Sequence, residues 1–230
     1  MSEKMQALFE EHVGLALSRQ RDLTTRIGDW RWDFAMDEGT MTFSKSGLFG
    51  LGGKEIVSPC QVLGSESDSQ GTWLWSWANT QSGIPAPLLS AAEALRERGA
   101  RDGIPELTER SVDLEAWDGH RIAMIASGMN SDCAGYYRGP YPGGALFVLL
   151  TGPALVTPVD KPVLRFGSIV PELLAGFTIT DHRRAARGLA QGLGLRVEEG
   201  ESWRVSGPDG AAKISFDAHG RITNVEGQVR

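Results

Sequence analysis

Three tryptophans at alternate positions, in Thr72-Trp73-Leu74-Trp75-Ser76-Trp77-Ala78-Asn79, constrain the fold more than any other stretch of the chain. Successive side chains of a β-strand point to opposite faces, so this spacing predicts a strand with all three indoles on one face. Burying even part of three indoles stabilises a fold by several kcal/mol, at about 25 cal/mol per Å² of apolar surface. We therefore expect a strand in the middle of a sheet. Its indoles either fill the core or, in part, line a ligand groove.

The residues before this strand predict one helix followed by three strands. Apolar residues recur at three- and four-residue spacing over residues 3–26, which is typical of an amphipathic helix. Apolar and charged residues alternate in residues 30–34, which predicts a half-buried strand with its aromatic side chains inward. Residues 41–43 are its expected hairpin partner, and residues 56–63 form the third strand.

The residues after the tryptophan strand predict two helices and a hairpin. The helices are expected at residues 87–98 and near 118–129, where apolar side chains recur with helical spacing. Strands at 134–138 and 145–150 are joined by the turn residues 141–144. Most consecutive strands are joined by short turns, which favours antiparallel pairing. The fold class is therefore α+β, with an antiparallel sheet of about six strands and helices packed on one face.

A change in composition after Thr151 predicts a division of the chain. Residues 153–162 contain three prolines and are typical of an extended linker between a main α+β domain, residues 1–152, and a small α+β domain, residues 163–230. The smaller domain is expected to contain one helix at 181–192 and four short strands. These strands are residues 195–198, 203–206, 212–216 and 222–225. The extension is either a degenerate repeat of the first domain or a common arrangement without kinship.

Several short motifs accompany the tryptophan strand. They are Asp29-Trp30-Arg31-Trp32-Asp33, Gly39-Thr40-Met41-Thr42-Phe43, Leu63-Gly64-Ser65, Gly103-Ile104-Pro105-Glu106-Leu107 and Tyr136-Tyr137-Arg138-Gly139-Pro140. Together with Trp-x-Trp-x-Trp-Ala-Asn, they resemble a bacterial family of uncharacterised proteins, one of the domain-of-unknown-function families, over roughly residues 3–152. The resemblance implies a shared fold. Because that family has no assigned activity, the resemblance implies no catalytic residue.

Composition narrows the class of partner. The 230 residues are 41% hydrophobic and 23% charged, which is typical of a soluble globular protein. The net charge of −6 disfavours binding to nucleic acid, because that binding depends on Lys and Arg neutralising phosphates. No run of 18 apolar residues occurs, and the chain starts with an amphipathic segment rather than an apolar one. We therefore expect no signal peptide, no membrane contact and a cytoplasmic location.

No sequence motif indicates a cofactor or a metal. Cys60 and Cys133 are too few for a disulfide scaffold, and none of the four histidines has metal-ligand spacing. The glycine-rich segment 47–54 does not fit a phosphate-binding loop, because Leu48 stands where the first glycine is needed and Glu55 follows the lysine. We interpret that segment as a flexible turn, and we expect neither a cofactor nor a bound metal.

A candidate ligand site combines the tryptophan strand with the predicted strand at 134–138. Alternation places Tyr136 and Arg138 on one face and Tyr137 on the other. An arginine beside aromatic rings suits an anionic or planar ligand, through cation–π contact and paired hydrogen bonds. Alternatively, Arg138 pairs with Asp33 or another carboxylate and the tyrosines fill the core. The candidate residues are Trp73, Trp75, Trp77, Asn79, Tyr136 and Arg138.

Three hypotheses for function follow from these patterns. The leading one is a non-enzymatic ligand- or protein-binding module with an aromatic-rich sheet, since no nucleophile–base pair, metal spacing or phosphate loop is recognisable. The second is a small-molecule enzyme that uses Arg138, Tyr136 and a carboxylate such as Asp33. The third is a structural or assembly protein. The expected partner is an unspecified small molecule or protein, and the sequence assigns no oligomeric state.

Overall fold

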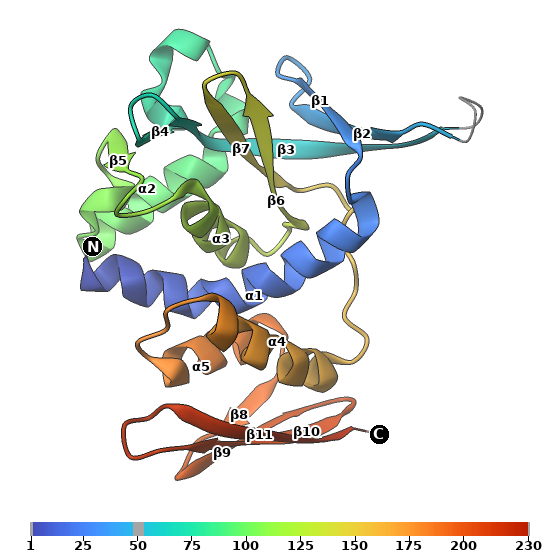
Figure 1. Ribbon diagram of the computed structural model, residues 1–230, viewed down its shortest axis with the longest axis vertical. Helices are drawn as coiled ribbons and strands as arrows, with labels where there is room; N and C mark the ends of the chain where they lie inside the picture. The colour runs from blue at the N-terminus through green and yellow to red at the C-terminus, as the bar shows by residue number, and fades with distance from the viewer. Residues whose placement is uncertain (1, 48–52, 230) are drawn as a thin grey trace. The chain divides into compact units, whose positions relative to one another are not determined.

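The computed structural model describes residues 2–47 and 53–229 (Figure 1). The predicted flexible turn at 47–54 therefore lies largely outside the described residues. The described chain is α+β, as predicted, with helices and two antiparallel sheets. In this part of the chain, no helix is both long enough and apolar enough to span a bilayer.

The chain forms two compact units. One comprises residues 1–5 and 19–157, and the other comprises residues 6–18 and 158–230. We call them the N-terminal unit and the C-terminal unit. Helix α1 (Glu3–Ile27) supplies residues to both, so the units do not follow chain order as the predicted division does.

Helix α1 forms where the apolar spacing predicts it. Ser2 is its N-cap, and the side chain accepts a hydrogen bond from the Met5 N–H. Gly28 ends the helix with a positive φ of 44°, a conformation that costs glycine little, and its N–H donates to the Thr24 carbonyl oxygen. The predicted helix over residues 3–26 is thus confirmed.

Within the described residues, the N-terminal unit contains a seven-stranded antiparallel sheet. Its strands are β1 (Arg31–Ala35), β2 (Thr40–Lys45), β3 (Lys54–Ser67), β4 (Thr72–Trp75), β5 (Ser111–Asp113), β6 (Gly135–Tyr141) and β7 (Gly144–Leu150). The long strand β3 organises the sheet, because it pairs first with β2 and then with both β4 and β7. The expected strands are present, and β5 is the addition. At three residues it is too short to give an alternating pattern.

The helices of the N-terminal unit lie close to their expected positions. Beside α1 they are α2 (Ser90–Asp102) and α3 (Gly119–Met129), with the short 3-10 turns η2 (Ser76–Ala78), η3 (Thr80–Ser82), η4 (Ala86–Leu88) and η5 (Pro105–Leu107). Helix α3 packs against β6 and β7 (Figure 1). It begins at the N-cap Asp118, whose side chain accepts from the Arg121 N–H at 3.0 Å.

The tryptophan strand is shorter than predicted. Trp73 and Trp75 share one face of β4 with their rings edge to face at 5.5 Å, and both are fully buried. The strand ends at Trp75 because the Ser76 hydroxyl donates to the Val62 carbonyl oxygen at 2.7 Å and the chain turns into η2. Trp77 therefore leaves the strand and stacks on Trp75 at 6.5 Å, so the prediction of three indoles on one strand face is wrong for Trp77.

Close packing around Trp73 depends on a glycine in β3. A Cβ atom built at Gly64 would lie 2.5 Å from the Trp73 ring and 2.5 Å from the Leu74 carbonyl oxygen. Real Cβ atoms do not approach ring or backbone atoms so closely, so only glycine lets β3 and β4 pair at this position with the indole between them.

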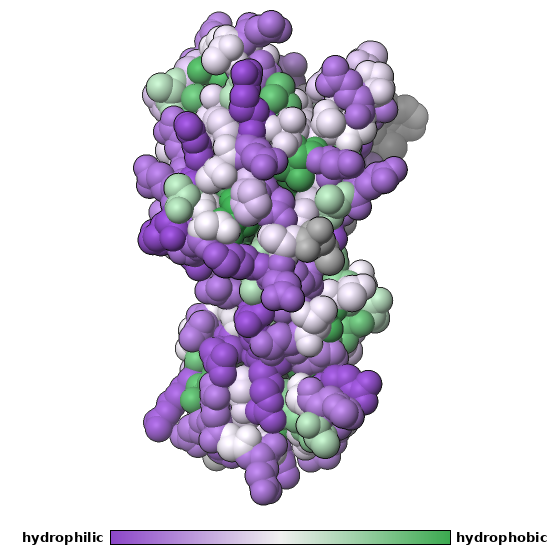
Figure 2. All heavy atoms as spheres, turned by 90° about the vertical axis from the view of Figure 1, so that its left-hand side faces the viewer, coloured by the Kyte–Doolittle hydropathy of each residue, from purple (hydrophilic) through white to green (hydrophobic). Residues whose placement is uncertain are grey.

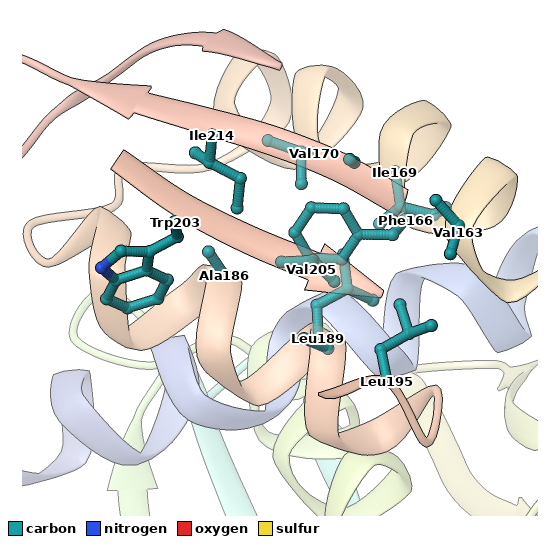
Figure 3. Close-up of a cluster of buried hydrophobic side chains, with 12 residues drawn as sticks. Val163, Phe166, Ile169, Val170, Ala186, Leu189, Leu195, Trp203, Val205 and Ile214 are labelled. Carbon is teal, nitrogen blue, oxygen red and sulfur yellow. The ribbon is translucent and has the colours of Figure 1, made fainter. Parts of the chain in front are cut away.

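The C-terminal unit contains helices α4 (Pro162–Gly176) and α5 (His182–Gly192) and a second antiparallel sheet. The sheet order is β11–β10–β9–β8, with β8 (Arg196–Glu198), β9 (Ser202–Gly207), β10 (Gly210–Phe216) and β11 (Ile222–Val229). Apolar side chains from α4, α5, β9 and β10 meet in one core (Figure 3). The predicted helix at 181–192 and the four predicted strands are all present.

Helix α4 is not among the elements predicted from the sequence, which places residue 162 in the linker. Residues 151–161 contain no helix or strand, and α4 begins at Pro162. Its first turn is capped from 46 positions away, because the Asp209 carboxylate accepts from the Val163 N–H at 3.0 Å and the Leu164 N–H at 3.1 Å. A local pattern cannot reveal a cap that comes from a distant hairpin.

A second carboxylate holds the start of α5. The Glu10 side chain is fully buried, and its Oε1 accepts from the Thr180 N–H at 2.6 Å, the Thr180 hydroxyl at 2.7 Å and the Gln6 amide at 2.9 Å. Arg184 lies 3.4 Å from the other carboxylate oxygen. Several donors thus compensate for burying this charge within the C-terminal unit.

Replacing Asp209 tests the capping of α4. Burial opposes ionisation of Asp209, but hydrogen bonds from the Val163 and Leu164 N–H groups outweigh it, so the pKa of this carboxyl lies below its ordinary value. We expect Asp209→Ala to lower the free energy of unfolding at pH 7 by about 1–2 kcal/mol, measured by urea denaturation.

The stability lost in Asp209→Ala should depend on pH in one direction. Because the folded-state pKa is depressed, the contribution is present above the ordinary carboxyl pKa and disappears as the pH falls through the folded-state value. The gap between wild type and Asp209→Ala should therefore narrow in acid. Asp209→Asn keeps one acceptor oxygen and should lose less stability. Equal urea midpoints for wild type and Asp209→Ala at pH 7 would contradict the capping role.

Candidate functional site

The ring of Phe147 on β7 is the centre of a cluster of polar and aromatic side chains. Tyr136 stacks on this ring at 6.3 Å, and His120 meets it edge to face at 5.4 Å. The guanidinium carbon of Arg138 lies 5.9 Å from the ring centre. Together with Glu66 on β3, which binds Arg138, these side chains form what we call the Phe147 cluster.

Strand alternation and hairpin register bring the cluster together. Tyr136 and Arg138 face Phe147, whereas Tyr137 points to the other side and packs against Trp32 at 6.0 Å and Phe43 at 5.0 Å. Arg138 is directly opposite Phe147 in the β6–β7 ladder. Tyr136 and Arg138 thus lie on one face of β6 and Tyr137 on the other, as strand alternation predicts.

Glu66 connects three elements of the N-terminal unit. One carboxylate oxygen accepts from the Gly119 N–H at 2.9 Å, at the start of α3, and the other accepts from the Arg138 Nε at 3.3 Å. The Glu66 side chain is only 10% exposed. A carboxylate is favourable at a helix N-terminus, and a buried one needs such partners. Arg138 therefore pairs with Glu66, while Asp33 is exposed on β1.

The guanidinium of Arg138 is anchored at one edge and open at the other. Its side chain is 35% exposed, and its Nε is held by Glu66. Among the residues that the structure describes, its two terminal amino groups make no hydrogen bond. A guanidinium held in this way presents parallel N–H groups that match the two oxygens of a carboxylate.

A histidine–tyrosine pair borders the guanidinium. The Nδ1 atom of His120 lies 2.9 Å from the Tyr136 hydroxyl oxygen. Burial, together with the negative charges of Asp118 and Glu66, raises the pKa of Tyr136, so the phenol stays protonated at neutral pH. When the imidazole is neutral, Nδ1 accepts from the phenol in one tautomer and donates to its oxygen in the other. His120 is exposed as a residue.

The other predicted site residues occupy structural positions. Trp73 is fully buried and meets Phe147 edge to face at 5.3 Å, so it supports the Phe147 cluster from within. The Trp75 indole N–H donates to the Glu106 carbonyl oxygen at 3.1 Å. Trp77 lies beneath the Arg96 guanidinium, and the Asn79 side chain accepts from the Ser82 N–H at 3.3 Å. The structure thus brings Trp73, Tyr136 and Arg138 together, but not Trp75, Trp77 or Asn79.

Sequence reasoning missed Glu66, His120 and Phe147. Glu66 lies beyond the strand predicted over residues 56–63, but it is part of β3. The pairing of Phe147 with Arg138 could have been predicted. A turn over residues 141–144 pairs Tyr141 with Gly144, and the same register pairs position 138 with 147. The contacts of Glu66 and His120 join segments far apart in the chain, and no local pattern signals them.

Residues 6–153 match the family model described as "Family of unknown function (DUF6882)". The chain belongs to this family. The predicted resemblance to a domain-of-unknown-function family over residues 3–152 is thereby confirmed. The DUF6882 match contains every residue of the Phe147 cluster and ends before α4. No curated protein and no solved structure matches the chain.

A double-mutant cycle tests whether Glu66 and Arg138 act as a pair. We expect Glu66→Gln and Arg138→Gln each to lower the free energy of unfolding by about 1–3 kcal/mol, because each leaves a partly buried charge without its partner. The double variant should lose less than the sum, with a coupling of about 1 kcal/mol in urea denaturation. Asp33→Asn is the matched control at an exposed carboxylate and should change stability by less than about 0.5 kcal/mol. Strict additivity would show that the pair is not coupled.

Proposed function

We propose that the N-terminal unit is a non-enzymatic binding module and that it recognises a small molecule carrying a carboxylate. The single observation behind this proposal is that the Arg138 guanidinium is held at one nitrogen and has no hydrogen-bond partner among the described residues at the other two. Glu66 fixes its Nε, whereas its terminal amino groups make no hydrogen bond with any described residue. A ligand carboxylate accepts two parallel hydrogen bonds from such a guanidinium.

The surroundings of Arg138 support this chemistry. Its orientation is already fixed by Glu66 and by the Phe147 ring, so little side-chain entropy is lost on binding. His120 borders the same ring and is exposed, so its imidazole can contact the same ligand. Because Trp73 and Trp75 are fully buried, the proposed ligand contacts belong to Arg138 and His120 rather than to the tryptophan strand.

The contact between His120 and Tyr136 favours one second candidate, a small-molecule enzyme. Histidine is the side chain that most often transfers protons near neutral pH, and a buried tyrosine that binds Nδ1 would orient its ring. The carboxylate of this alternative is Glu66 rather than Asp33, because Glu66 is the one in contact with Arg138. Conversion of a bound ligand is the measurement that separates the two candidates.

The apolar surface gives the assembly alternative less support than the Phe147 cluster gives to binding. Among the described residues, the large hydrophobic side chains that are exposed are Val57, Tyr141, Val156 and Leu164, in four separate segments. The face drawn in Figure 2 is mainly hydrophilic, with hydrophobic areas that are small and scattered. A continuous apolar patch is the usual mark of an assembly surface.

The two cysteines bear on the compartment in which we propose that the protein works. Cys60 and Cys133 are both buried free thiols, which agrees with a reducing compartment such as the cytoplasm. The cytoplasmic location and the bacterial origin stay predictions.

A thermal-shift screen with carboxylate-bearing metabolites, each paired with its uncharged amide, tests the binding proposal. A ligand that binds only the folded state must raise the melting temperature. We expect at least one carboxylate to do so in wild type while its amide does not, and we expect Arg138→Gln to abolish the response. Arg31→Gln is the matched control, because it removes the same charge from an exposed position on β1 and should respond like wild type.

A further variant, Arg138→Lys, and mass spectrometry of the ligand separate the possible outcomes. Arg138→Lys retains the charge but not the paired N–H groups, so it should bind more weakly than wild type and more tightly than Arg138→Gln. Equal shifts in wild type and Arg138→Gln, or no shift with any carboxylate, would refute the binding proposal. If mass spectrometry shows that a ligand is converted and that His120→Gln prevents the conversion, the enzyme candidate replaces it.

A further inference from the structure

An arginine of the C-terminal unit lies on two aromatic rings. The guanidinium carbon of Arg183, in the first turn of α5, is 3.9 Å from the ring centre of Phe216 and 5.3 Å from that of Trp203. The turn at Gly220 borders it, since a Cβ atom built there would lie 3.6 Å from the Arg183 Nε. An arginine stacked on aromatic faces keeps the N–H donors in its own plane available for other partners.

Hydrogen-bond donors at this position have no acceptor. Among the described residues, Arg183 makes no hydrogen bond or ion pair. Trp203 is only 1% exposed, yet its indole N–H has no partner within the same set of residues. Figure 3 shows the indole nitrogen on the side of the ring that faces away from the labelled aliphatic core. A buried donor without an acceptor is costly, and most such groups in folded proteins are paired.

His182 precedes Arg183 in α5 and also carries a donor. His182 Nδ1 accepts from the Ile222 N–H at 3.2 Å, so the imidazole proton lies on Nε2. Arginine, indole N–H and this imidazole N–H are all donors. The complement of the Arg183 guanidinium is a group that only accepts hydrogen bonds.

The nearby carboxylates are already engaged. Asp217 accepts from the Arg221 N–H and the Arg221 side chain, and Glu199 binds Arg187 at 2.7 Å. Asp181 caps α5 through the Arg184 N–H. Arg183 is therefore a positive charge that the surrounding acidic side chains leave without an ion pair.

We propose that the C-terminal unit carries an oxyanion-binding site, with Arg183 as the principal contact and the rings of Phe216 and Trp203 as the surface that orients it. The ligand is a compact oxyanion, and a phosphate group suits the site best. A phosphate has several acceptor oxygens and carries more charge than a carboxylate, so it suits a guanidinium that has no ion pair. This site is independent of the Phe147 cluster and lies outside the DUF6882 match.

Titration of the full-length, ¹⁵N-labelled chain with inorganic phosphate tests the proposal by NMR. The Trp203 indole N–H resonance is assigned by its loss in Trp203→Phe, which keeps a ring beneath Arg183. We expect phosphate to shift this resonance and that of the Arg183 Nε–H saturably, at constant ionic strength. Arg183→Gln should weaken phosphate binding about tenfold or more, as read from the Trp203 resonance.

A control variant, Arg204→Gln, and a second anion, acetate, complete the experiment. Arg204→Gln removes the same charge from the exposed face of β9 and should bind phosphate like wild type. A parallel titration with acetate tests whether the ligand group is a phosphate or a carboxylate. A saturable response that depends on Arg183 and is stronger for acetate would assign a carboxylate instead. No saturable shift with either anion, or an undiminished shift in Arg183→Gln whose spectrum remains that of a folded protein, would overturn the site.

Discussion

The carboxylate of Glu66 is the interaction on which the N-terminal unit most depends. A buried charge is tolerated only when donors replace its hydration, and Glu66 has two, the Gly119 N–H at the start of α3 and the Nε of Arg138 on β6. One side chain thus joins β3, β6 and α3. It also fixes the plane of the guanidinium, so the Phe147 cluster follows from satisfying one buried charge.

Capping by acidic side chains recurs throughout the chain. Asp118 caps α3 from the adjacent position, as local patterns anticipate, whereas Asp209 caps α4 and Glu10 holds the residues before α5 from far away in sequence. The N-terminus of a helix carries unpaired N–H groups and a partial positive charge, so a carboxylate satisfies both. Helices with weak local start signals are thereby fixed by tertiary contacts.

The two arginines proposed as ligand contacts are oriented by different means. Arg138 is held at Nε by a carboxylate beside one ring, and Arg183 rests on two rings without an ion pair. In both cases packing restricts a long side chain and leaves N–H groups available, so binding costs less entropy than it would for a free surface arginine. The difference in local charge favours a carboxylate at the first and a phosphate at the second.

The sequence by itself determined the α+β class, most of the strands and helices, and the separation of Tyr136 and Arg138 from Tyr137, because side-chain periodicity is a local property. Only the tertiary structure decided that the tryptophan strand ends at Trp75, where the Ser76 hydroxyl binds β3. The same is true of α4 and of the contacts that Glu66 and His120 make in the Phe147 cluster. Each of these depends on hydrogen bonds or packing between segments far apart in the chain, which no local pattern of residues encodes.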